Sequence, residues 1–101
     1  MAAITNPGTN ATEFAGDYKM VSFYNLALTT ADDTLTLTAA ANGISEIQNV
    51  MSCANAGTDA NFQVVGCRFS GLVIRLNASE GDGTQADEFT GTTCNLIVIG
   101  K

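Results

Sequence analysis

The sequence predicts an all-β protein, a compact antiparallel β-sandwich or barrel (jelly-roll-like or Ig-like) of about six to seven strands with an extended N-terminal arm. Between residues 18 and 100, apolar residues recur at alternate positions in short runs, which is the period of a strand with one buried face. Glycine, asparagine and serine separate these runs, as turns require. A chain of 101 residues forms one domain and buries roughly 65% of its unfolded surface, enough for a core.

Residues 1–16 form the predicted arm, and residues 17–101 form the single β domain. The arm holds the chain's only proline, Pro7, and two isolated apolar residues, Ile4 and Phe14. Such a segment has weak structure of its own but can become ordered on a partner. We therefore expect Ile4, Pro7 and Phe14 to contact a partner protein.

The first strand of the domain is predicted at residues 18–30, and its first half is apolar on both faces. A strand with two covered faces lies either in the centre of a sandwich or against another subunit. The subunit interpretation gives four interface candidates, which are Met20, Phe23, Tyr24 and Leu26.

A polar turn follows at Ala31-Asp32-Asp33, because adjacent aspartates suit turn geometry through hydrogen bonds to the backbone. Residues 34–38 then alternate threonine with Leu35 and Leu37, which predicts a half-buried strand with a threonine outer face. These two strands are expected to form the first hairpin.

A short helical turn is expected at residues 39–41, where Asn42-Gly43 ends it at once. Residues 44–53 fit a helical stripe as well as a strand, and the short length of the segment favours the strand. Residues 62–69 predict a further strand, interrupted at Gly66 by either a bulge or a point of close backbone approach.

Ser70-Gly71 is expected to turn the chain into the strand with the cleanest alternation, at residues 72–77. The last strand is predicted at residues 95–100, where four consecutive apolar residues suit a central position covered on both sides.

The charge balance argues against two classes of partner. Ten acidic residues against four scattered basic residues give a formal net charge of −6, and a field of that sign repels nucleic acid and anionic membranes. No apolar run approaches the roughly 18 residues that a membrane span requires. The N-terminus lacks the pattern of a secretory signal, so we expect synthesis and folding in a cytoplasm.

The sequence contains no histidine, the commonest acid/base and metal-binding side chain. Each serine and cysteine therefore lacks a histidine base, and we expect no enzyme activity and no cofactor. Cys53, Cys67 and Cys94 show no CxxC spacing and are expected to be buried reduced thiols. One pair would still form a disulfide in a mature protein that works outside a cell.

An acidic loop at residues 79–91 is the sharpest local feature of the chain. Its carboxylates are ligands that calcium prefers, but their spacing does not match an EF-hand, and carboxylates in a glycine-rich loop are usually only solvated. We expect no metal site. If one exists, its candidate ligands are Glu80, Asp82, Asp87 and Glu88.

The arm, the β domain rich in Thr, Ala, Gly and Asn, the absence of His and Trp, and the ending NLIVIGK at residues 95–101 form a distinctive combination. Together they resemble small virion proteins of tailed bacteriophages, of the capsid decoration (cement) type. The resemblance implies a β-rich homo-oligomer, with a trimer favoured. It also implies an N-terminal segment that grips the major capsid protein where capsomers meet.

The function expected from this resemblance is that of a non-enzymatic virion protein, made in the host cytoplasm, that stabilises a phage head. A phage tail or fibre component is a close alternative. A further alternative, from another class, is a calcium-assisted binding module, for example for carbohydrate, built around residues 79–91.

Overall fold

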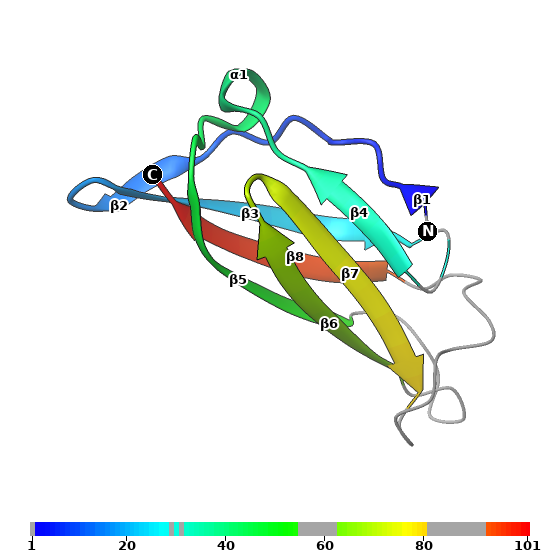
Figure 1. Cartoon of the computed structure of the whole chain (residues 1–101). Coiled ribbons are helices and arrows are strands. Elements are labelled where there is room, and N and C mark those ends of the chain that lie inside the picture. The colour runs from blue at the N-terminus through cyan, green and yellow to red at the C-terminus, as the bar shows by residue number, and fades with distance from the viewer. Residues whose placement is uncertain (1, 29, 31, 55–62, 81–92) are drawn as a thin grey trace.

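Strands make up nearly all of the regular structure in the computed structural model (Figure 1), which describes residues 2–28, 30, 32–54, 63–80 and 93–101. The all-β prediction is therefore confirmed. In chain order the elements are β1 (Ala2–Ala3), β2 (Thr12–Ala15), β3 (Tyr18–Ala27), β4 (Asp32–Thr36), α1 (Ala39–Asn42), β5 (Ile47–Ala54), β6 (Gln63–Ser70), β7 (Val73–Glu80) and β8 (Thr93–Gly100).

Two sheets form the layers of a sandwich, as predicted (Figure 1). The first sheet has the strand order β1-β4-β7-β6, and the second has the order β2-β3-β8-β5. All pairs are antiparallel except that the two-residue strand β1 runs parallel to β4. Apart from β1, three antiparallel strands face four.

The core lies between the two sheets and, among the described residues, is built from aliphatic side chains, Phe23 and the Cys94 thiol. Along β8, buried residues such as Leu96 and Val98 alternate with half-buried ones, and β8 lies between β3 and β5. The last strand is therefore central, as predicted. Burial of each large apolar side chain contributes roughly 1.5–3 kcal/mol. The largest fully buried apolar residues are Phe23, Leu35, Leu37, Ile44, Ile74, Leu76, Leu96, Val21 and Val98.

A bulge in strand β3 shifts its buried residues from odd-numbered to even-numbered positions. Phe23 lies opposite Leu96 while Leu26 lies opposite Cys94, so β3 has one residue more than its partner over this step. Asn25 supplies that residue in the left-handed conformation at φ 57°, which Asn tolerates better than most residues. Val21 and Phe23 before the bulge and Leu26 and Leu28 after it therefore all point into the same core, although they occupy odd and even positions in the sequence.

The predicted first hairpin is wrong, because β3 belongs to the second sheet and β4 to the first. Asp32 and Asp33 are also not a turn but the first two residues of β4, paired with β7. The side chain of Asp33 is fully buried and accepts hydrogen bonds from the backbone N–H and the hydroxyl of Thr30. These side-chain bonds hold the chain as it enters the strand.

The middle of the chain follows most of its predictions. Helix α1 is one short turn, capped by the hydroxyl of Thr38 and ended by Gly43 at φ 74°. The ambiguous segment that follows is strand β5, as favoured. Of the two alternatives for Gly66, the bulge is wrong, because β6 pairs with β7 in unbroken register from Gln63 to Ser70. The backbone does not approach unusually closely there either, since a Cβ at Gly66 would lie 3.9 Å from the Asn77 carbonyl oxygen. Gly66 leaves a gap in the row of side chains on β6, but it does not add a residue to the strand as a bulge would.

The arm is extended, as predicted, and it pairs with its own domain at the edges of both sheets (Figure 1). Near its start, the Ile4 N–H donates to the Thr34 carbonyl at 2.8 Å. In its middle, the Asn6 amide donates to the buried Asn42 at 2.7 Å, and the Ala11 N–H donates to the Asn42 carbonyl at 2.8 Å. A turn at residues 16–17 then leads into β3.

Candidate functional site

The four predicted interface residues separate into two groups. Phe23 and Leu26 are only 1% and 4% exposed and lie in the core of their own chain, so they cannot contact another subunit. Met20 and Tyr24 are 40% and 75% exposed on the opposite side of β3. The bulge explains this division, because it brings Leu26 to the inner face that Phe23 already occupies.

Met20 belongs to a strip of apolar side chains on the outer face of the second sheet, which we call the apolar face. It lies beside Ile99 of β8, and Met51 of β5 lies beside Ile97 of β8. Met51 is 48% exposed, and both isoleucines are half-buried and alternate with the inward residues of β8. Antiparallel sheets commonly present polar residues on their solvent side. A strip of four apolar side chains across three strands departs from that pattern.

The arm residues predicted to contact a partner occupy different positions. Ile4 is half-buried and packs against the core of its own domain, while Pro7 is exposed. The side chain of Phe14, a residue of β2, lies outside the described part. Ile4 and Pro7 line one side of a hollow of about 500 Å³ whose other side includes Tyr24 and Leu26 of β3. The structure thus brings together two of the predicted arm residues and two of the predicted interface residues.

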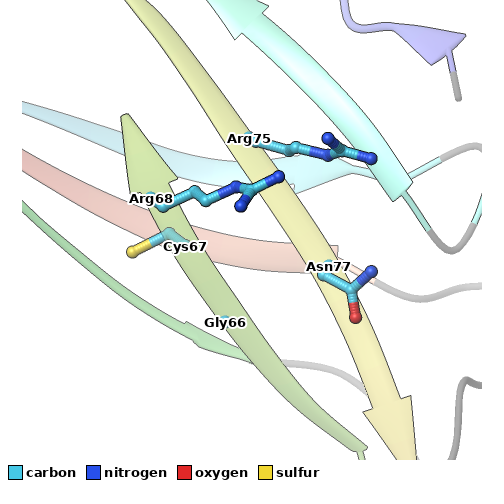
Figure 2. A pocket seen from close by; sticks show the side chains of 5 residues that line it. All are labelled: Gly66, Cys67, Arg68, Arg75 and Asn77. Atoms are coloured by element: carbon cyan, nitrogen blue, oxygen red, sulfur yellow. The ribbon is translucent and has the colours of Figure 1, made fainter. Parts of the chain in front are cut away.

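A pair of arginines lies on the outer face of the first sheet. Arg68 on β6 and Arg75 on β7 are direct cross-strand partners, and their side chains extend in the same direction across the sheet (Figure 2). They line a hollow of about 270 Å³, which we call the arginine hollow, together with Gly66, Cys67 and Asn77. Gly66 lies opposite Asn77, so β6 offers no side chain at that place. Cys67 turns away to the other face of β6 (Figure 2).

Asp32 of β4 fixes the orientation of Arg75. The Arg75 Nε donates to Asp32 Oδ1 at 2.7 Å, and Nη2 donates to Oδ2, so the contact is bidentate. This hydrogen-bonded partner lowers the pKa of the Asp32 carboxyl below its ordinary value and raises the pKa of the Arg75 guanidinium. Arg68 also lies near enough to favour the ionised form of Asp32. Asp32 and Arg75 are therefore both charged at neutral pH.

The arginine hollow was not among the predicted sites, because the four basic residues look scattered along the chain. One signal in the sequence could have revealed it. The hairpin between β6 and β7 turns at residues 71–72, one residue later than the predicted Ser70-Gly71 turn, and this register places Arg68 opposite Arg75. Moving the predicted turn by that one residue would have revealed the pair, since the turn as predicted places Arg68 opposite Val73.

The three cysteines are free, and they differ in burial. Cys94 is a buried thiol as expected, and desolvation raises its pKa to about 11. Cys67 is half-buried and donates to the Val50 carbonyl at 3.6 Å. Cys53 is exposed, so the prediction that all three are buried is wrong for this residue.

The calcium candidates fall largely outside the described residues. Glu80 ends β7, but its side chain and all of Asp82, Asp87 and Glu88 lie outside them. Across the ranges that the structure describes, no group of three or more His, Cys, Asp or Glu residues is placed to hold a metal ion. Those ranges also contain no helix long and apolar enough to cross a membrane.

Comparison of the chain with protein-family models, with curated proteins and with solved structures finds no match.

Proposed function

We propose that the protein is a non-enzymatic structural component of a virion, of the capsid decoration type, which acts through its outer surfaces. The apolar face of the second sheet is the observation that carries this proposal. Contiguous exposed apolar surface marks sites of protein interaction more often than single exposed apolar residues do. The strip formed by Met20, Met51, Ile97 and Ile99 crosses three strands without an intervening charge.

The apolar face is proposed as the contact between subunits of a homo-oligomer, with a trimer favoured. Of the remaining interface candidates, Met20 supports this assignment because it lies in the strip, whereas Tyr24 lines the hollow beside the arm. Methionine suits such a surface, since its unbranched side chain adapts to an irregular neighbour. Oligomerisation would strengthen a weak capsid contact by raising its effective concentration.

The hollow between the arm and β3 is proposed as the contact with the major capsid protein. It combines exposed Pro7 with Tyr24, whose large ring offers apolar area at a low cost in conformational entropy. Residues of the arm and of the domain form one surface there, so a partner bound in this hollow would touch both.

The oligomer is tested by light scattering on the wild-type protein and on Met20→Lys and Met51→Lys. We expect both substitutions to reduce the mass to that of a monomer, because a charge would be buried without a partner. Thr36→Lys, at an exposed position of the first sheet, is the matched control and should leave the mass unchanged. A monomeric wild-type protein would contradict the homo-oligomer.

Capsid attachment is tested by adding purified protein to capsids that lack it and measuring occupancy and resistance to heat. We expect saturable binding and a higher disruption temperature. Tyr24→Ala should weaken attachment, since it removes an exposed ring without touching the core. Absence of binding to heads, with binding to isolated tails, would favour the tail component instead.

A further inference from the structure

The paired arginines carry a cost that the packing of the sheet does not explain. Like charges directly opposite each other on one face of an antiparallel pair are destabilising. Asp32 neutralises one of the two guanidinium charges, and the group of Arg68, Arg75 and Asp32 retains a net charge of +1. This local positive charge stands out on a chain whose formal net charge is −6.

The two guanidinium groups also retain most of their hydrogen-bonding capacity. Each guanidinium has five N–H donors in a planar fork. Arg75 uses two on Asp32, which leaves three. Arg68 forms no hydrogen bond or ion pair with another residue of the described ranges. Planar forks of this kind match the two oxygens of a carboxylate.

The arginine hollow is too small to enclose a whole small molecule, since its volume of about 270 Å³ lies below the roughly 300–1,000 Å³ of sites that do so. The same two arginines also line a neighbouring hollow of about 410 Å³ on the other side of the pair, together with Phe69 and Val73. Gly66 keeps one side of it open, and Asn77 lines it beside Gly66 with an amide (Figure 2). Such a space suits one side chain that enters from outside, with its charged end toward the arginines.

We propose that the arginine hollow binds the carboxylate of an aspartate or glutamate side chain from a partner protein. The charge decides between oxyanions: the local net charge of +1 matches a singly charged carboxylate better than a doubly charged phosphate. The acidic remainder of the chain disfavours a polyanion further. This proposal deepens the proposed function and rests on it only for the identity of the partner.

The first experiment uses acetate as the probe. In NMR titrations of the labelled protein, sodium acetate should shift the backbone amides of Gly66 and Asn77 saturably, whereas sodium chloride of equal ionic strength should not. Arg68→Gln should lower the affinity for acetate at least tenfold, and Arg68→Lys, which keeps the charge but loses the fork, should lower it by less. Lys101→Gln, which removes one charge beyond β8, is the matched control and should titrate like the wild type.

Thermal unfolding of the same variants separates binding from folding. Arg68→Gln should unfold at the same temperature as the wild type or higher, because it relieves the repulsion with Arg75. The proposal is overturned if acetate gives no saturable shift, if Arg68→Gln binds acetate as the wild type does, or if phosphate binds more tightly than acetate.

The second experiment identifies the source of the carboxylate. If a second copy of this chain supplies it, Arg68→Gln should lower the oligomer mass in light scattering. If the capsid protein supplies it, Arg68→Gln should lower capsid occupancy without changing the mass. If Arg68→Gln changes neither the oligomer mass nor the capsid occupancy, the proposal that a partner protein supplies the carboxylate is overturned. Wild-type protein that binds acetate but no capsid would contradict the proposed function and leave the carboxylate site standing.

Discussion

Asn42 is the buried side chain that fastens the arm to the domain. Its carboxamide makes four hydrogen bonds, which is its full capacity. The oxygen accepts from the Asn6 amide at 2.7 Å and from the Thr38 N–H at 3.1 Å. The nitrogen donates to the Asn6 side-chain oxygen at 3.2 Å and to the Thr9 carbonyl at 2.9 Å.

Asn42→Ala removes all four bonds and leaves the Thr38 N–H without its acceptor. A net contribution of roughly 0.5–1.5 kcal/mol per bond, lessened where water enters beside Asn6 and Thr9, gives a loss of about 2–4 kcal/mol in the free energy of unfolding. A domain of this size has a stability of roughly 5–15 kcal/mol, so the variant should still fold.

Two measurements check this prediction. Urea unfolding gives the global loss, and hydrogen exchange at the Ile4 and Ala11 amides, which bond to β4 and to the Asn42 backbone, reports on the arm itself. Thr38→Ala is the control, because it removes the helix cap, at a cost of about 1 kcal/mol, while keeping the backbone N–H. If both amides keep their protection in Asn42→Ala, the side chain does not fasten the arm and the reasoning fails.

Three further predictions concern single positions elsewhere. Gly100→Ala should destabilise the fold by roughly 1–3 kcal/mol in urea unfolding, because the new Cβ would lie 2.2 Å from a backbone oxygen; a smaller loss would show that the strand ends shift easily. Because Arg75 lowers the Asp32 pKa, the pair contributes stability in full above pH 3.8 and loses it as the pH falls through the folded pKa. Asp32→Asn should therefore make the melting temperature fall less steeply as the pH is lowered below 3.8, and a melting temperature that falls as in the wild type would contradict the pairing. A thiol reagent at pH 8 should modify the exposed Cys53 quickly and the buried Cys94 only on unfolding. With a pKa of about 11, only about one Cys94 thiol in a thousand is ionised at that pH, and mass spectrometry after timed quenching measures the extent of modification at each cysteine.

Local patterns were enough to predict most strands and one turn. Alternation predicts β7 and most of β4, because each has a single buried face and side-chain direction then follows from sequence position. A run of consecutive apolar residues predicts the central strand β8. The β6–β7 hairpin was also predictable, since Gly71 adopts the positive φ of 60° that a tight turn requires. The turn lies at residues 71–72, however, and the turn predicted at Ser70-Gly71 would pair Arg68 with Val73, so the meeting of Arg68 and Arg75 depends on a shift of one residue that the sequence pattern does not determine.

Features that depend on distant residues were not predictable in this way. The bulge at Asn25 reverses the parity of β3, and its N–H is held by the Asn95 side chain, 70 residues away. The sequence pattern alone places Phe23 and Leu26 on opposite faces, so it predicts a strand that is apolar on both sides and includes both residues in the subunit interface. Asp33 likewise has the local propensity of a turn residue. It lies in a strand because it is buried in the sandwich and pairs with Leu76 of β7, and neither contact can be inferred from neighbouring residues in the sequence.

The position of the arm gives the capsid proposal a definite mechanism to test. The resemblance implies an arm that grips the shell, yet here the arm pairs with β4 and β3 of its own domain. If the arm leaves the domain to bind, breaking the Asn42 bonds lowers the cost of release, and Asn42→Ala should bind capsids more tightly than the wild type. If the arm binds while docked, as the hollow beside Tyr24 suggests, the same variant disorders one side of the contact and should bind more weakly. Measured occupancy of Asn42→Ala at limiting protein therefore distinguishes the two mechanisms by the direction of the change, and equal occupancy would remove the arm from the contact.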